Sequence, residues 1–271
     1  MSRPDQSITF LRTYGYSVFR FPRASAQPLE LMHREGKDLT RLGDLGQLIG
    51  AGAVPIPPVR RDDRPGIDIE GRETSKINVN IGLSFLGAFV GALGGNNLGL
   101  QTGFGNAKTI AFQYAGVMED CVDVLALEMF IKAGAINPHI PSGTLEKLLD
   151  DEIYIVTSVL KTRRIVVSAQ GEAGQNVQLD VPVIQGAVGG NLKVDREGTT
   201  SAKVMFEGAF PLAFGLQAVQ LVFDDSGEFL TTQQLPAGDA AARAIVQTTA
   251  VRGTRGPVFL EARGAFVRLG A

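Results

Sequence analysis

Residues that build metal sites and disulfides are scarce in this sequence. Its 271 residues include one cysteine, Cys121, and two histidines, His33 and His139. A single cysteine excludes an internal disulfide framework, and both histidines lie too far from it in sequence for a His/Cys metal site. We therefore predict no structural metal, and we expect Cys121 to be a small core residue.

The sequence also lacks a strong net charge, a secretory signal and a long apolar run. Its net charge is -2 and its pI is near 5.8, which argues against nucleic acid as a partner. The N-terminus, Met-Ser-Arg-Pro-Asp-Gln, lacks the apolar run of a signal peptide, and this predicts a cytoplasmic location. The longest apolar block, Phe85 to Leu93, would cover about half of a bilayer, whereas a spanning helix needs roughly 18 to 20 apolar residues.

Motifs of catalysis are missing as well. The chain has no Gly-x-Ser-x-Gly turn and no phosphate-binding loop, and the glycines around Gly94 and Gly99 do not form a dinucleotide fingerprint. Carboxylates cluster near Glu119 and near Asp150, but such runs are usually solvated faces or helix ends. We predict that the chain is not an enzyme and that it has no catalytic, cofactor-binding or metal-binding residues.

What is present is the composition of a β-rich globular protein. Hydrophobic residues make up 44% of the chain, enough to bury a full core in one large domain or two ordinary ones. The apolar run Ile153 to Leu160 predicts a central strand that is buried on both faces. Other strands are predicted at Tyr16 to Phe21, Phe214 to Phe223 and Phe229 to Gln233. The predicted fold class is α+β, with a twisted, mainly antiparallel β-sheet and peripheral helices.

Three short helices are expected around this sheet. Proline favours the first turn, so Pro28 to Glu35 is predicted to be helical. Negative charge suits a helix N-terminus, so Glu119 and Asp120 are placed at the start of a second helix. Its apolar face would carry Val122, Leu125, Ala126 and Phe130. The third helix would begin at the N-cap Ser142 and would turn inward Leu145, Leu148 and Leu149.

Apolar and polar residues alternate on both sides of a glycine-spaced block between Lys76 and Tyr114. Alternation gives a β-strand one apolar and one polar face, and segments of about 10 such residues are typical of transmembrane β-strands. The pattern fits either an ordinary sheet with one face on the core or a hairpin that inserts into lipid. The helix-like block Phe85 to Leu93 would form the tip, buried in the resting chain. The candidate membrane-facing residues are Ile77, Val79, Ile81, Leu83, Phe85, Phe89, Leu93, Leu98, Leu100 and Phe104.

A second alternating hairpin is predicted between Ile165 and Phe206. Its candidate membrane-facing residues are Ile165, Val167, Val177, Leu179, Val181, Val183, Leu192, Val194, Val204 and Phe206. Flanking basic residues could meet anionic lipid head groups, at about 1 kcal/mol each near a charged surface. They are Lys161, Arg163, Arg164, Lys193, Arg196 and Lys203.

Six short segments carry a resemblance to a known family over nearly the full length. They are Phe-Leu-Arg-Thr-Tyr-Gly-Tyr from Phe10, Asp-Leu-Thr-Arg-Leu-Gly from Asp38, Pro-Pro-Val-Arg-Arg-Asp from Pro57, Gly-Ala-Leu-Gly-Gly from Gly91, Val-Leu-Lys-Thr-Arg from Val159 and Val-Pro-Val-Ile-Gln from Val181. By these segments the chain resembles the bacterial gasdermins. Many members carry a palmitoylated cysteine at the third or fourth position, where this sequence has Arg3 and Pro4. Cys121 does not match that motif, so we do not expect it to be lipidated.

The resemblance implies a gasdermin N-domain-like fold and an autoinhibited pore-forming effector of antiphage defence. In such a protein, a caspase-like or other protease removes a short C-terminal inhibitory peptide. The body, expected at residues 1–250, then inserts β-hairpins into the inner membrane and kills the infected cell. Backbone groups in lipid must all be hydrogen-bonded, so a lone hairpin cannot insert stably and neighbouring copies must form a homo-oligomeric ring.

The expected inhibitory peptide comprises residues 251–271. The candidate cleavage positions are Arg252 and Arg255, and the residues expected to dock are Val258, Phe259, Leu260, Phe266, Val267 and Leu269. Burial of these side chains yields roughly 1.5 to 3 kcal/mol each, while ordering some 20 residues costs on the order of 1 to 2 kcal/mol each. Such a peptide binds marginally when free, but on the same chain its effective concentration is of millimolar order. One cut can therefore turn a secure restraint into a weak ligand.

Two other classes of function remain open from the residues alone. A soluble β-rich ligand-binding protein without membrane activity would use the tail only as a docking segment, and its truncation would not be toxic. A hydrolase with scattered catalytic carboxylates would instead have a pocket with a perturbed acid pair. A leakage assay with and without the tail separates the pore-forming interpretation from both.

Overall fold

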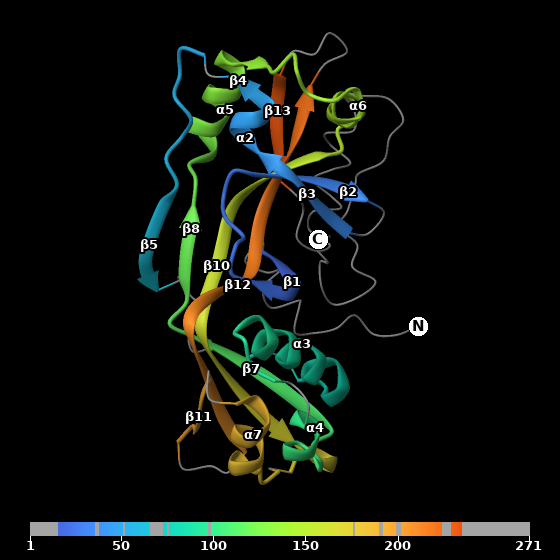
Figure 1. The fold of residues 1–271 in the computed structure, drawn as a ribbon, viewed down its shortest axis with the longest axis vertical. Coiled ribbons are helices and arrows are strands. Elements are labelled where there is room, and N and C mark those ends of the chain that lie inside the picture. Colours follow the sequence, from blue (N-terminus) through green and yellow to red (C-terminus); the bar gives the residue numbers. More distant parts are fainter. Residues whose placement is uncertain are drawn as a thin grey trace.

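The computed structural model describes residues 16–35, 38–50, 52–65, 73–74, 76–96, 99–175, 177–189, 192–198, 202–223 and 229–234. Two long antiparallel strands, β10 (Ile153–Gln170) and β12 (Lys203–Phe223), form the spine of an 11-stranded sheet. The spine runs along the long axis of the molecule (Figure 1). The central strand predicted at Ile153 to Leu160 is confirmed, because all of that run is buried within β10.

Short strands line both outer edges of the spine and divide the sheet into an upper, a middle and a lower tier (Figure 1). In that order, the strands beside β10 are β2 (Glu30–Glu35), β8 (Met118–Cys121) and β7 (Thr109–Ala115). Those beside β12 are β13 (Phe229–Gln234), β1 (Ser17–Arg23) and β11 (Lys193–Arg196). The β10 side is extended by β3 (Asp38–Asp44), β5 (Arg60–Pro65) and β6 (Ile77–Asn78). All these pairings are antiparallel, as predicted.

A two-stranded sheet, β4 (Ile49–Gly50) with β9 (Ala135–Ile136), lies outside the large one. Within the spine, the register shifts where one tier meets the next. At the boundary between middle and lower tiers, Thr162 faces Leu212 but Arg164 faces Glu207, so β12 carries extra residues there. Such bulges bend a strand and increase its local twist. The lower tier therefore leaves the line of the upper two.

Helices cover the sheet in two groups (Figure 1). Around the upper tier lie α2 (Leu45–Leu48), α5 (Val124–Ala133) and α6 (Ser142–Leu149). Over the lower tier lie α3 (Val79–Ala92), α4 (Leu100–Gly103) and α7 (Val181–Val188), and a short 3-10 turn, η1 (Glu172–Gly174), follows β10. Side chains cap several N-termini; for example, the Asp123 carboxylate accepts a hydrogen bond from the amide of Ala126 at 2.9 Å.

Two of the three expected helices differ from the sequence-based prediction. The predicted helix at Pro28 to Glu35 is wrong: Leu29 has a φ of 70° in a turn, and β2 then pairs with the start of β10. Glu119 and Asp120 lie in β8 rather than at a helix N-terminus, and α5 starts later because Asp123 caps it. In that helix Leu125 is 67% exposed, so its predicted inward position is also wrong.

The third expected helix, α6, is present with small differences. It begins at Ser142, but the N-cap is Pro141. Of the three leucines predicted to point inward, Leu148 is buried, whereas Leu145 and Leu149 are 36% and 42% exposed. The strands predicted at Phe214 to Phe223 and Phe229 to Gln233 are confirmed within β12 and β13.

Candidate functional site: the helices over the lower tier

Most of the first predicted hairpin is helical, so the expectation of a strand from Ile77 to Leu83 is wrong for this structure. In the described part of the run from Ile77 to Phe104, only β6 pairs as a strand, with the start of β7. The Asn78 side chain then accepts a hydrogen bond from the Asn80 amide at 2.9 Å and caps α3. This cap satisfies an amide that a continuing strand would have paired with a neighbour, and it favours the helix.

The apolar pattern of this segment satisfies two periods at once. Val79 and Leu83 alternate with polar residues, yet with Leu86, Val90 and Leu93 they also follow the spacing of one helix face. Val79 is half-buried against the core, and the other four residues are buried. Ile81 is 43% exposed because it lies off that face. The period-two pattern alone therefore could not choose between helix and strand.

The centre of the segment matches its prediction. Phe85 and Phe89 lie in α3 and Leu93 caps its C-terminus, and all three are buried, as expected for the block at the hairpin tip. Leu100 and Phe104 are also buried, but they belong to α4 and its C-cap and not to the predicted strand. The remaining candidate, Leu98, lies outside the described residues.

The second predicted hairpin contains parts of three strands, and a helix lies between them in sequence. Ile165 and Val167 lie in β10, Val194 in β11, and Val204 and Phe206 in β12, all with buried side chains. The predicted strand from Val177 to Val183 is wrong. In that run the buried Val177 and Leu179 precede α7, which contains the half-buried Val181 and the 38% exposed Val183.

Local sequence explains why α7 forms. Its N-cap is Asp180, whose carboxylate accepts a hydrogen bond from the amide of Val183 at 3.1 Å. Pro182 occupies the first turn, where its missing amide hydrogen costs nothing. Ile184 is then fully buried and Leu192, just before β11, is also buried. These residues favour a helix, and the alternating pattern contains no information about them.

Glycines let the helices approach the strands and one another closely. A Cβ atom on Gly82 of α3 would lie 2.3 Å from Ile110 Cγ1 in β7, and one on Gly103 of α4 would lie 2.3 Å from Ile184 Cγ1 in α7. On the strand side, a Cβ on Gly208 would meet Leu93 at 2.5 Å. The helices and the lower tier thus share one closely packed apolar core, which we call the lower core.

Aromatic contacts join the strands and α3 within the lower core. The rings of Tyr114 and Phe214 stack with centroids 4.0 Å apart and an interplanar angle of 9°. Phe85 of α3 meets Phe112 of β7 edge to face at 5.1 Å. Such pairs add about 0.5 to 1.5 kcal/mol beyond the burial of their area. Burial raises the pKa of Tyr114 well above its usual range.

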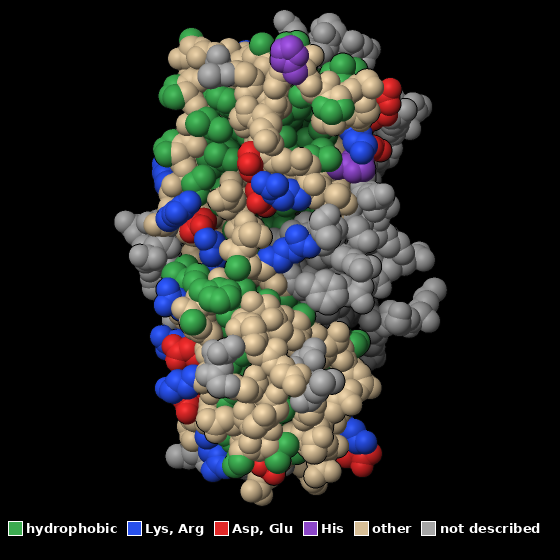
Figure 2. All heavy atoms as spheres, viewed as in Figure 1, with side chains coloured by type: hydrophobic (Ala, Val, Ile, Leu, Met, Phe, Trp, Pro, Cys, Tyr) green, Lys and Arg blue, Asp and Glu red, His purple; other side chains and the backbone are tan. Residues whose placement is uncertain are grey.

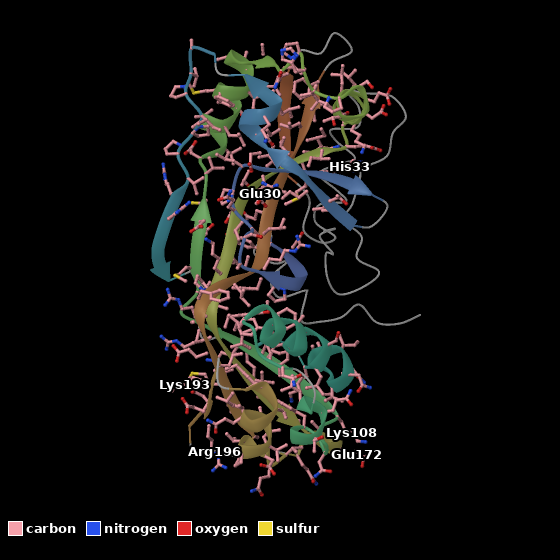
Figure 3. The ribbon with its side chains drawn as sticks, viewed as in Figure 1. Glu30, His33, Lys108, Glu172, Lys193 and Arg196 are labelled. Carbon is pink, nitrogen blue, oxygen red and sulfur yellow. The ribbon has the colours of Figure 1, made fainter. Side chains whose placement is uncertain are left out.

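The opposite face of the lower tier is polar. Arg164 pairs with Glu207 across β10 and β12 at 3.2 Å, and Lys193 pairs with Asp195 on β11 at 2.9 Å. The hydrogen bond that Lys193 donates to Asp195 raises the pKa of Lys193. Acidic and basic side chains accordingly adjoin one another along the lower left edge in Figure 2, and Figure 3 labels Lys193 and Arg196 there. The lower parts of β10 and β12 and the strand β11 therefore have one apolar face under helices and one face that carries charged side chains.

The other basic residues predicted to flank this hairpin differ in their surroundings. Lys161 is 19% exposed and forms an ion pair with Asp120, while Lys203 Nζ lies 3.9 Å from Glu73 Oε1. Arg163 is exposed at the bulge between the tiers. Their predicted contact with lipid head groups stays a prediction.

One polar cluster was missed by the sequence analysis. The hydroxyl of Tyr16 donates to Glu119 Oε1 at 2.6 Å, and the Ser158 hydroxyl donates to the same oxygen at 2.6 Å. Tyr16 lies just before β1, Glu119 lies in β8 and Ser158 lies in β10. In sequence, Glu119 and Ser158 are 103 and 142 positions from Tyr16. Burial raises the pKa of Tyr16 well above its usual range. No local pattern could have revealed this contact, because only the sheet order brings the residues together.

Several features bear on other kinds of site. No helix in the described part of the chain combines the length and apolar character needed to cross a bilayer. Among the described residues, no three His, Cys, Asp or Glu side chains are placed to hold a metal ion.

The predicted cleavage and docking residues lie outside the described residues; they are Arg252, Arg255, Val258, Phe259, Leu260, Phe266, Val267 and Leu269.

Comparisons with known proteins agree with this architecture. The model of the Bacterial Gasdermin Family matches residues 19–228. A Gasdermin bGSDM from a Desulfuromonadales bacterium is 38% identical over 267 residues, which is 98% of this chain and 97% of that protein. The Gasdermin bGSDM of Lysobacter enzymogenes is 38% identical over 243 residues, or 89% of each chain. The chain therefore belongs to the bacterial gasdermin family.

A solved structure supports the fold. The structure of a bacterial gasdermin from Bradyrhizobium tropiciagri superposes with a TM-score of 0.63 at 18% sequence identity, covering 99% of this chain and 97% of that one. At this level of identity the likeness concerns the fold. It agrees with the predicted α+β class and the gasdermin-like sheet.

Proposed function

We propose that this protein is an autoinhibited pore-forming effector of antiphage defence. It rests in the cytoplasm until a protease removes the C-terminal peptide at residues 251–271. The body then inserts the segments around Ile77–Phe104 and Ile165–Phe206 into the inner membrane as β-hairpins, assembles with further copies into a ring, and kills the infected cell. In this proposal the protein itself catalyses no reaction.

The observation that carries this proposal is the two-faced lower tier in a chain of the bacterial gasdermin family. The apolar face of its strands is covered by α3, α4 and α7, while the opposite face of β10, β11 and β12 carries partly exposed ion pairs. If those helices leave or unwind, the apolar face becomes available to lipid and the charged face to water. This is the alternation that a membrane-spanning strand requires.

The resting conformation also defines what activation must change. At about 3.3 Å per residue, nine extended residues reach close to 30 Å, the thickness of the hydrocarbon layer. Lys76 to Ser84 has that length only if the first turns of α3 unwind. The backbone amides released from the helix then need partners on neighbouring strands. Oligomerisation therefore accompanies insertion in this proposal.

A leakage assay tests the proposal. Liposomes of bacterial lipid composition, loaded with a self-quenching dye, are mixed with the full chain and with a version carrying an engineered protease site after Arg252. We expect the intact chain to be inert and the cleaved chain to release dye, and expression of residues 1–252 to be toxic to cells. Intact liposomes after complete cleavage would falsify the proposal.

A further inference from the structure

A buried polar contact ties the N-terminal strand to the far side of the spine. Tyr16 is 8% exposed and immediately precedes β1, which pairs with β12. Its hydroxyl reaches Glu119 in β8 and lies 3.2 Å from the hydroxyl of Ser158 in β10. Because the strand order here is β1, β12, β10 and β8, the contact between Tyr16 and Glu119 links strands that are separated by β12 and β10.

The chemistry of this contact makes it strong. One carboxylate oxygen, Glu119 Oε1, accepts hydrogen bonds from both Tyr16 and Ser158 at 2.6 Å. Hydrogen bonds to an ionised acceptor are short and about twice as strong as neutral ones. A tyrosine hydroxyl is protonated at physiological pH even at its ordinary pKa of about 10, and burial raises the pKa of Tyr16 further, so Tyr16 acts as a donor.

The backbone pairing of β1 with β12 is irregular. Its register with β12 shifts between Val18 and Arg23, so its ladder with β12 is interrupted. β1 is also an edge strand, so side-chain contacts matter for its local stability. The contact of Tyr16 with Glu119 and Ser158 therefore contributes much of what holds β1 in place.

β1 in turn supports the helix that covers the lower tier. α3 packs against β1, and the two lie side by side in Figure 1. The ring of Tyr16 also belongs to the lower core, together with Leu83 and Phe85 of α3. One side chain thus contacts both the anchor in the middle tier and the apolar cluster that α3 must leave.

We propose that Tyr16, held by Glu119 and Ser158, is a restraint on α3 that is separate from the C-terminal tail. Removal of the tail frees the body, and opening of the Tyr16 contact then sets how fast α3 departs from the lower tier. The consequence for leakage rests on the proposed function, but the restraint on α3 is a property of the resting chain and can be measured without a membrane.

Hydrogen exchange in the full-length protein tests this restraint. Tyr16→Phe removes the donor and keeps the ring, and we expect amide exchange within α3 to become roughly 10- to 100-fold faster, the factor that corresponds to one lost charge-assisted hydrogen bond. Glu119→Gln should act in the same direction with a smaller effect, since it keeps an acceptor without the charge. The amides of α5, in the upper tier, should exchange at the parent rate.

Tyr114→Phe is the matched control. It removes the hydroxyl of another buried tyrosine in the lower core, whose ring stacks on Phe214. Unchanged exchange of α3 in Tyr16→Phe, an equal acceleration in Tyr114→Phe, or acceleration that includes α5 would each overturn the restraint. After tail cleavage, Tyr16→Phe should also release dye sooner than the parent. If the cleaved parent releases none, the pore function fails while the exchange result still decides the restraint.

Discussion

The hydroxyl of Thr162 donates a hydrogen bond to the backbone carbonyl of Ala115 at 2.6 Å. Thr162 of β10 is fully buried beside the bulge in β12, and Ala115 is the last residue of β7. The same hydroxyl accepts a hydrogen bond from the amide of Arg164 at 2.9 Å. It therefore satisfies backbone groups that the shifted register leaves outside the regular ladder, at the level where the middle tier meets the lower one.

Thr162→Val keeps the shape of this side chain and removes its hydrogen bonds. Buried backbone groups that lose their partner cost about 1 to 3 kcal/mol, so the free energy of unfolding should fall by that amount. Urea denaturation measures the change. Thr109→Val, at a half-buried position in β7, is the control and should change stability by less than about 0.5 kcal/mol. Equal effects of the two substitutions would argue against a special role of Thr162.

A second prediction concerns the glycines of α3. Gly82→Ala places a methyl group 2.2 Å from Ile110 Cδ1, in a position where Ile110 is 1% exposed and cannot move outward. We expect a loss of about 1 to 3 kcal/mol from overpacking. Gly91→Ala, in the same helix with no atom within 4 Å of the added methyl, should be neutral or should gain up to about 1 kcal/mol. Thermal unfolding of both variants checks the contrast, and a stable Gly82→Ala would show that the contact of α3 with β7 is looser than the structure indicates.

The third prediction concerns the lipid-facing role of the first hairpin. Val79 and Asn80 both lie in the first turn of α3, where an aspartate interacts favourably with the helix dipole. In an extended strand, however, the two residues point to opposite faces. Val79→Asp should therefore keep the resting fold and cleavage but block dye release, because it puts a charge on the lipid-facing side.

Asn80→Asp is the control for Val79→Asp and should leak like the parent after cleavage. Circular dichroism on the uncleaved variants verifies that both still fold. Equal leakage from Val79→Asp and the parent would count against the hairpin assignment.

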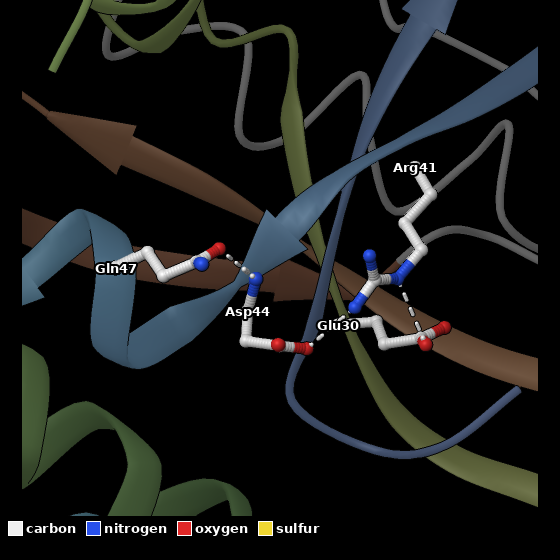
Figure 4. A network of polar contacts seen from close by, with 4 residues as sticks. All are labelled: Glu30, Arg41, Asp44 and Gln47. Carbon is white, nitrogen blue, oxygen red and sulfur yellow. Dashed lines mark hydrogen bonds and ion pairs between the residues drawn. The ribbon is translucent and has the colours of Figure 1, made fainter.

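The fourth prediction is a pH dependence at the polar network of β2 and β3 (Figure 4). Glu30 is 4% exposed, and its carboxylate accepts a hydrogen bond from Arg41 Nε at 3.0 Å. Arg41 also pairs with Asp44, whose amide donates to the side chain of Gln47. Burial raises the pKa of Glu30 above its usual range, and the neighbouring Arg41 lowers it by less.

The raised pKa determines the sign of the effect on stability. The folded chain binds the proton on Glu30 more tightly than the unfolded chain, so this contribution to stability is complete below the unfolded pKa of about 4.3. It is lost as the pH rises through the raised folded pKa. We expect the stability of the parent relative to Glu30→Gln to fall with rising pH over this window, measured by urea denaturation at a series of pH values. A relative stability that rises with pH would mean that Arg41 outweighs burial.

Sequence patterns were sufficient where the local signal had one interpretation. The run Ile153 to Leu160 is too apolar and too β-branched to be anything but a buried strand. Phe85 to Leu93 was expected as a buried helix-like block, and the structure has it so. Patterns failed where a short segment satisfied two periods, as in Val79 to Leu83, or where a cap such as Asp180 overrode the alternation.

The sequence by itself determined the β-rich composition, the two segments with alternating faces, and the resemblance to a family. It could do so because composition and period are local properties of the chain. The tertiary structure alone decided that α3, α4 and α7 pack over the lower tier, and that Tyr16 meets Glu119 and Ser158. These outcomes depend on close contacts at glycines and on the order of strands in the sheet, which join residues far apart in the chain.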